Sequence, residues 1–259
     1  MRVPGFRRPE PSATAADHEQ RGLLALSHGD YRTAEDSLRH ALSLFERDDD
    51  QAGVAGIHAK LGVVAQDQGR LETAETSFRR AVTIFERLGD EARLANCLGL
   101  LGILAQDRGD HRTAEEVLRR ALALEERLGH RAGIAAAHHQ LAMLAQARGD
   151  LQAAETGYLR ALTILEQLDD PTNLATTWSQ LGILRTEQGL HADAVQLHVR
   201  ALAVRIAIEV PQAAIDGDAL VGLLQIMGTE AFTAEVAQIL DAESTQRLMS
   251  QLNSLADRA

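Results

Sequence analysis

Ten histidines and one cysteine are the residues of this 259-residue chain that could support metal or acid–base chemistry. A zinc site needs several His, Cys or carboxylate ligands at short spacings, such as HExxH on one helical turn, and no such motif occurs. His18, His58 and His138 lie forty and eighty residues apart. If they occupy equivalent places in a repeated structure, they cannot share one ion. We therefore predict that they are packing residues and that the chain has no metal site.

The sequence also contains no motif for nucleotide binding or for a catalytic nucleophile. The only lysine, Lys60, stands in HAKLG and not in a Walker loop, and neither GxGxxG nor GxSxG occurs. Cys97 has no basic neighbour except Arg93, so we interpret it as a buried structural thiol. Glutamates and aspartates are numerous, but their helical columns indicate a solvated face. We predict that the chain is not an enzyme and uses no cofactor.

Charge and composition exclude further classes of protein. The chain has 26 basic and 37 acidic residues, a formal charge of −11, which disfavours a nucleic-acid partner. No apolar run approaches the ~18 residues that span a bilayer, so no membrane association is expected. One cysteine excludes an intrachain disulfide and fits a reducing compartment, which predicts a cytoplasmic protein. A 45% hydrophobic content with 3% aromatics and five prolines favours an all-α fold.

The positions of the histidines and the cysteine in the fold depend on a forty-residue repeat. One glycine column recurs, and a left-handed position at a helix end favours that residue. Two columns of small residues flank it and allow helix axes to approach closely. The glycine column is Gly29, Gly69, Gly109, Gly149 and Gly189; the first small column is Gly22, Gly62, Gly102, Ala142 and Gly182; the second is Ala41, Ala81, Ala121, Ala161 and Ala201. The repeat predicts five helix hairpins, with Val221-Gly222 and Thr233-Ala234-Glu235 marking a degenerate sixth.

These columns resemble the tetratricopeptide repeat, most directly in Trp178-Ser179-Gln180-Leu181-Gly182. The period is forty here instead of the common 34, as in the longer variants found in bacterial regulators and motor light chains. The resemblance implies an all-α, right-handed superhelical solenoid of antiparallel hairpins. We expect a disordered leader over residues 1–14, about six hairpins over 15–241 and a capping helix over 242–259.

A stripe on the first helix of each hairpin is the candidate binding surface. The resemblance implies that this stripe lines a concave groove, with an apolar floor and an amide edge suited to an extended or helical protein segment. The alternative is that the apolar members pack against neighbouring first helices or are covered by the C-terminal helix, and that the glutamines form a solvated polar column. The predicted binding residues are Val63, Gln66, Asn96, Ile103, Gln106, His139, Met143, Gln146, Ser179, Ile183 and Thr186.

Two functions fit this surface. The first is a non-enzymatic scaffold or adaptor that holds a protein or peptide segment in the groove, in bacterial regulation. The second is a sensor that binds a small signalling peptide or ligand and controls a separate effector. The residues do not determine an oligomeric state.

Overall fold

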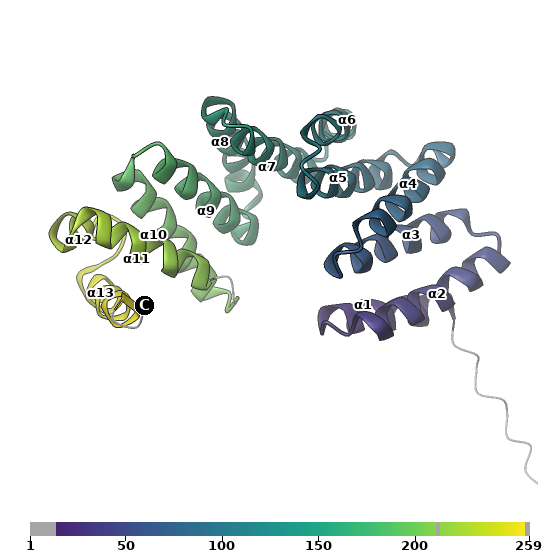
Figure 1. Ribbon diagram of the computed structural model, residues 1–259, viewed down its shortest axis with the longest axis horizontal. Helices are drawn as coiled ribbons and strands as arrows, with labels where there is room; N and C mark the ends of the chain where they lie inside the picture. The colour runs from purple at the N-terminus through teal and green to yellow at the C-terminus, as the bar shows by residue number, and fades with distance from the viewer. Residues whose placement is uncertain (1–13, 211–212, 257–259) are drawn as a thin grey trace, which may run out of the picture. The chain divides into compact units, whose positions relative to one another are not determined.

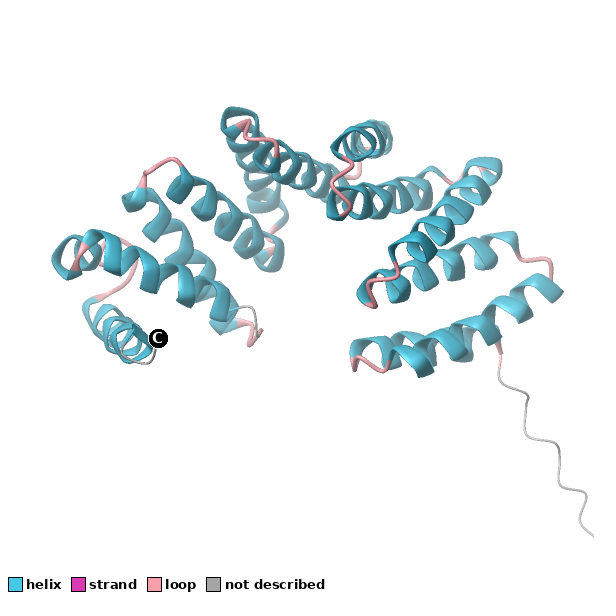
Figure 2. Ribbon diagram, viewed as in Figure 1, coloured by secondary structure: helices cyan, strands magenta, loops and turns pink. Residues whose placement is uncertain are grey.

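The computed structural model describes residues 14–210 and 213–256, and within these ranges the regular structure consists of thirteen helices without a strand (Figure 1, Figure 2). The prediction of an all-α chain is confirmed. The helices are α1 (Ala15–Ser27), α2 (Tyr31–Arg47), α3 (Gln51–Asp67), α4 (Leu71–Leu88), α5 (Glu91–Asp107), α6 (His111–Leu128), α7 (Arg131–Ala147), α8 (Leu151–Leu168), α9 (Pro171–Glu187), α10 (His191–Ala207), α11 (Ala213–Met227), α12 (Thr229–Val236) and α13 (Ala242–Ala256).

The chain divides into two compact units, the first ending at Leu124 and the second starting at Glu125, within α6. In the first unit, α1 to α5 pack in sequential order, each helix against the next. In the second unit, α7 to α11 do the same. Within each unit, consecutive helices therefore pack in sequence order, which is the packing expected of a repeat array.

The turn inside each hairpin is set by the predicted glycine column. Gly69 has a φ of 72° and Gly109 a φ of 74°, in the left-handed region. The Gly69 amide donates to the Gln66 carbonyl and the Arg70 amide to the Ala65 carbonyl, both at 2.8 Å, so these two carbonyls in the last turn of α3 have partners. The turns between hairpins also use left-handed residues, but three of these are not glycine: Asp49, Asp169 and Glu209.

The small columns bring the two helices of a hairpin together. A Cβ added to Gly62 would lie 2.5 Å from the Phe78 ring, and one added to Gly102 would lie 2.5 Å from the Leu118 side chain. Phe78 and Leu118 are both fully buried. The large residue of the second helix therefore fills the space that the glycine of the first helix leaves open.

The ends of the array differ in detail from the expected boundaries. Residues 1–13 of the expected leader lie outside the described residues, and Thr14 N-caps α1 through a capping box with Asp17. The second helix of the sixth hairpin, α12, ends at Val236, five residues before the expected end at Asp241. The final helix, α13, buries Leu248, Met249 and Leu252 in a cluster with α10, α11 and α12.

Candidate functional site

The predicted binding residues lie on the first helices α3, α5, α7 and α9, and we call this stripe the first-helix surface. In the first unit Asn96 is exposed, whereas Val63, Gln66, Ile103 and Gln106 are half-buried. Val63 packs partly against a core that contains Ala65 and Leu104. The apolar members thus contribute to packing and still present part of their surface to solvent.

Gln66 links neighbouring first helices in the first unit. Its Nε2 donates to Asp107 Oδ2 of α5 at 2.8 Å. At this point of the expected amide edge, the amide is paired with a carboxylate of the next hairpin. The polar edge of the surface therefore consists of amide groups and carboxylate groups.

In the second unit, Gln146 occupies the corresponding place and its orientation is determined by its neighbours. Tyr158 Oη donates to Gln146 Oε1 at 2.9 Å, and Gln146 Nε2 donates to Glu187 Oε1 of α9 at 2.9 Å. The reversed amide would set an oxygen against the Glu187 carboxylate, and neither atom could donate. Burial raises the pKa of the Tyr158 phenol, so this hydroxyl keeps its proton.

His139 presents a hydrogen-bond acceptor on the same surface. The Thr177 hydroxyl donates to the Asn173 carbonyl at 2.8 Å, so its oxygen accepts from His139 Nδ1 at 3.1 Å. Burial lowers the pKa of His139 from 6.5 to about 4, which keeps the imidazole neutral at pH 7. A neutral ring with its proton on Nδ1 carries a lone pair on Nε2.

The remaining predicted residues of the second unit divide into two groups. Met143, Ile183 and Thr186 are half-buried, and Met143 packs partly against the core around Tyr158. Ser179 is only 2% exposed, and its hydroxyl donates to Asp216 Oδ1 at 2.5 Å. Ser179 therefore does not belong to the accessible part of the first-helix surface.

Ser179 belongs to a buried polar network that the sequence analysis missed. Asp216 of α11 also pairs with His198 Nδ1 at 2.8 Å and with Arg205 Nη1 at 2.5 Å, and all four side chains are buried. Ser179 donates to the carboxylate, and His198 Nε2 is buried without a hydrogen-bond partner among the described residues. The histidine therefore does not activate the serine as it would in a catalytic triad. The sequence does contain a pattern that could have predicted this network, because polar residues interrupt two apolar columns of the repeat. His198 and Arg205 stand where other hairpins have Leu38 and Phe45.

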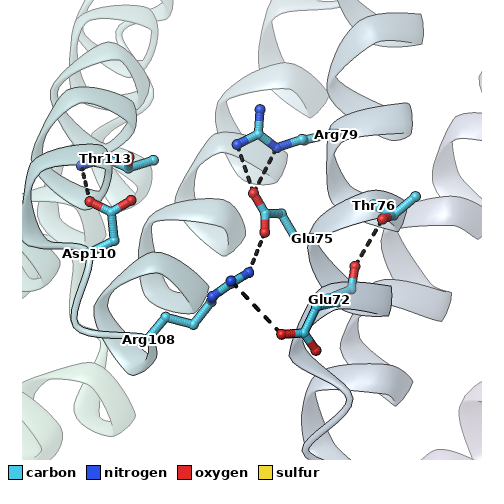
Figure 3. Close-up of polar contacts among 7 residues, drawn as sticks. All are labelled: Glu72, Glu75, Thr76, Arg79, Arg108, Asp110 and Thr113. Carbon is cyan, nitrogen blue, oxygen red and sulfur yellow. Dashed lines mark hydrogen bonds and ion pairs between the residues drawn. The ribbon is translucent and has the colours of Figure 1, made fainter.

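A cavity of about 650 Å³ lies between α4, α5 and α6 in the first unit. Leucines of α5 line it, and charged side chains of both signs surround it. Arg108 lies between Glu72 and Glu75, and Glu75 also binds Arg79 at 2.7 Å (Figure 3). Because these arginines are paired with carboxylates, the cavity has no evident preference for ligand charge.

Glu75 is one of a column of glutamates that connect successive hairpins. Glu35 pairs with Arg70 at 2.7 Å and Glu155 with Arg185 at 2.7 Å, as Glu75 pairs with Arg108. The side chains of Glu35, Glu75 and Glu155 are 17%, 32% and 30% exposed. The interpretation of these glutamates as a solvated face was wrong, since each joins its own hairpin to the next one.

The histidines and the cysteine expected to be structural lie within the packing of the helices. His58 is 9% exposed and burial lowers its pKa, while His18 stacks on His40 with ring centroids 5.3 Å apart. Cys97 is free and 3% exposed, and burial raises the pKa of its thiol to about 11. Throughout residues 14–210 and 213–256, no three His, Cys, Asp or Glu side chains are grouped so that they could hold a metal ion.

The fold places the chain among helical-hairpin solenoids of the tetratricopeptide type. It is similar to a Rap protein crystallised with competence and sporulation factor, at 17% identity and a TM-score of 0.69 over 94% of this chain and 75% of that one. It is also similar to BtubC from P. vanneervenii (21%, TM-score 0.65, 91% and 92%) and to aspartyl phosphate phosphatase F from Bacillus subtilis (14%, TM-score 0.68, 94% and 69%). At these identities the similarity concerns the fold alone.

The sequence itself defines the family. The tetratricopeptide repeat model matches residues 53–127 and 133–207, more than half of the chain, so the chain belongs to the tetratricopeptide repeat family. A comparison with curated protein sequences gave no match. None of the helices in the described ranges combines the length and apolar character needed to cross a bilayer.

Proposed function

We propose that this chain is a non-enzymatic scaffold that binds a protein or peptide segment on its first-helix surface, in the cytoplasm and in bacterial regulation. One observation carries the proposal. On the first helices of both units, half-buried apolar side chains lie beside polar side chains held by neighbouring hairpins, as with Met143 beside Gln146. Apolar anchors with oriented polar groups are the usual components of a segment-binding surface.

A sensor that binds a small signalling peptide is the second candidate. The Rap structure that shares this fold was crystallised with competence and sporulation factor. The same surface serves either function, because both need an apolar floor with fixed hydrogen-bonding groups. The two functions differ in whether the occupant is a segment of a larger protein or a free peptide.

The test is affinity capture from the native lysate with wild type and with a His139→Ala, Met143→Glu, Gln146→Ala variant. We expect the variant to lose specific partners, because it removes the acceptor, the anchor and the oriented amide together. A Gln152→Ala, Leu159→Glu variant is the control, since both residues are exposed on the second helix α8. Identical partner lists from all three proteins would refute the proposal. Size-exclusion analysis of the captured material separates protein partners from free peptides.

A further inference from the structure

The charge on the first-helix surface of the second unit comes from one carboxylate. From residue 132 to 147, α7 contains no Lys, Arg, Asp or Glu, and α9 contains only Arg185 and Glu187. Arg185 pairs with Glu155 of α8, and its side chain is 17% exposed. Glu187, in contrast, is exposed and is held by the Gln146 amide from α7. Arg131, the first residue of α7, donates to Gln167 of α8. Since both arginines of these two helices contact α8, the surface presents a fixed negative charge at Glu187.

The carboxylate of Glu187 can accept a further cationic partner. Gln146 Nε2 binds only Oε1, and Oε2 accepts no hydrogen bond from the residues that the structure describes. A carboxylate has about four lone-pair sites, so most of its acceptor capacity is open. An ammonium or guanidinium group satisfies such an acceptor better than any neutral donor does.

His139 Nε2 provides a second open acceptor on the same face. The Thr177 bond fixes the proton on Nδ1, and within the described chain Nε2 has no hydrogen-bond donor. A backbone N–H group is the donor that every peptide segment supplies, so this nitrogen can hold the backbone of an occupant in place.

The distance between His139 and Gln146 along α7 determines which backbone conformation the bound segment needs. His139 and Gln146 are seven residues apart on one helix, which corresponds to about 10 Å of axial rise. Half-buried Met143 lies between them on α7, and Ile183 is half-buried on α9. Three residues of extended chain cover about 10 Å, so an extended segment reaches from the acceptor to the carboxylate across an apolar floor.

We propose that the first-helix surface of the second unit binds an extended segment with an apolar side chain on Met143 and Ile183 and a lysine or arginine about three residues away on Glu187. This inference rests on the proposed function and specifies the chemistry of the partner. The His139 acceptor fixes the backbone, and Glu187 selects the charge.

The experiment titrates the full chain with three labelled nonapeptide libraries and follows fluorescence anisotropy. Each library fixes a leucine and, three residues later, either lysine, glutamine or glutamate, with mixed residues elsewhere. We expect the lysine library to bind at least about tenfold more tightly than the glutamate library, since opposite charges attract and like charges repel across the surface. Added salt should reduce this preference.

Three variants assign the effect to named atoms. Glu187→Gln keeps an oxygen for the Gln146 amide and should reduce the lysine preference to less than about twofold. The His139 ring packs edge-on against Tyr158, with ring centroids 5.5 Å apart. His139→Phe keeps a ring in this place, removes the acceptor and should weaken all three libraries by about fivefold. Glu166→Gln makes the same charge change on an exposed position of α8 and should leave the preference as in wild type.

The outcomes separate this inference from the proposed function. If the glutamine or glutamate library binds as tightly as the lysine library, and Met143→Glu abolishes that binding, the charge selection is refuted while segment binding stands. A lysine preference that persists in Glu187→Gln also refutes it. If no library binds, or if Met143→Glu binds as wild type does, both the inference and the proposed function fail.

Discussion

His139 is the residue whose environment makes the clearest prediction about pH. Burial lowers its pKa from 6.5 to about 4, so between these values the unfolded chain binds a proton that the folded chain does not. The free energy of unfolding therefore falls as pH falls from 6.5 to 4, and the contribution of His139 is complete above 6.5. We expect wild type to lose about 3 kcal/mol more than His139→Phe between pH 7 and pH 4.

Urea unfolding at a series of pH values checks this expectation. His58 and His138 also have pKa values lowered by burial, so both proteins should lose stability in acid. The test is the difference between the two curves. Curves that stay parallel from pH 7 to pH 4 would show that the His139 ring is solvated in the folded chain.

Two glycines of α5 predict opposite effects of the same substitution. A Cβ at Gly102 would lie 2.5 Å from buried Leu118, whereas nothing lies within 4 Å of a Cβ at Gly99. Gly102→Ala should lower the free energy of unfolding by roughly 1–3 kcal/mol through overpacking. Gly99→Ala should raise it by about 0.5–1 kcal/mol, because alanine favours the helix. Chemical denaturation of both variants measures the signs, and equal signs would contradict the close approach of α5 and α6.

At the scale of elements, the glutamate column explains how a helical hairpin recognises the next one. Small residues allow close approach within a hairpin, but they do not specify which hairpin follows. The Glu155 and Arg185 pair is partly sheltered and joins α8 to α9, and Gln188 Nε2 donates to the same glutamate at 3.3 Å. A networked pair at an interface contributes more than a single exposed pair does.

Double-mutant cycles compare this contact with an exposed pair of the same type. We expect Glu155→Gln and Arg185→Gln to show a coupling energy of about 1 kcal/mol, because the arginine is largely screened from solvent. The Glu243 and Arg247 pair within α13 is 77% and 73% exposed, and its cycle should give no measurable coupling. If the two cycles give the same value, the interhairpin pair does not contribute to stacking.

The sequence predicted the elements well and the polar contacts between them poorly, for a physical reason. Gly69 must adopt a left-handed conformation and Gly62 must admit Phe78, so each is a local requirement visible as a repeated column. The partner of Glu155 lies thirty residues away and depends on how hairpins stack, which no local pattern specifies. The predicted column did include Gln146, but its orientation is fixed by Tyr158 and Glu187, each from a different helix.

For the whole molecule, contacts between sequence neighbours predict that stability is distributed in segments. Within each unit, consecutive helices pack on one another, so the loss of one interface need not unfold a distant hairpin. The buried Asp216 network is local in this sense, because it joins α9, α10 and α11 within the second unit. Removing its carboxylate leaves the Arg205 charge buried without that partner, which costs about 3–5 kcal/mol.

Trp178, the only tryptophan, reports on this distribution because it packs against the core around Tyr158 in the second unit. We expect Asp216→Ala to lower the urea midpoint followed by Trp178 fluorescence. Gly102→Ala lies in the first unit. It should shift the start of the transition followed by far-UV circular dichroism to a lower urea concentration and leave the fluorescence midpoint nearly unchanged. Nearest-neighbour stability requires this separation of probes, whereas a two-state chain requires that both probes shift together for both variants. Coincident shifts would therefore mean that the two units unfold as one cooperative structure despite their separate cores.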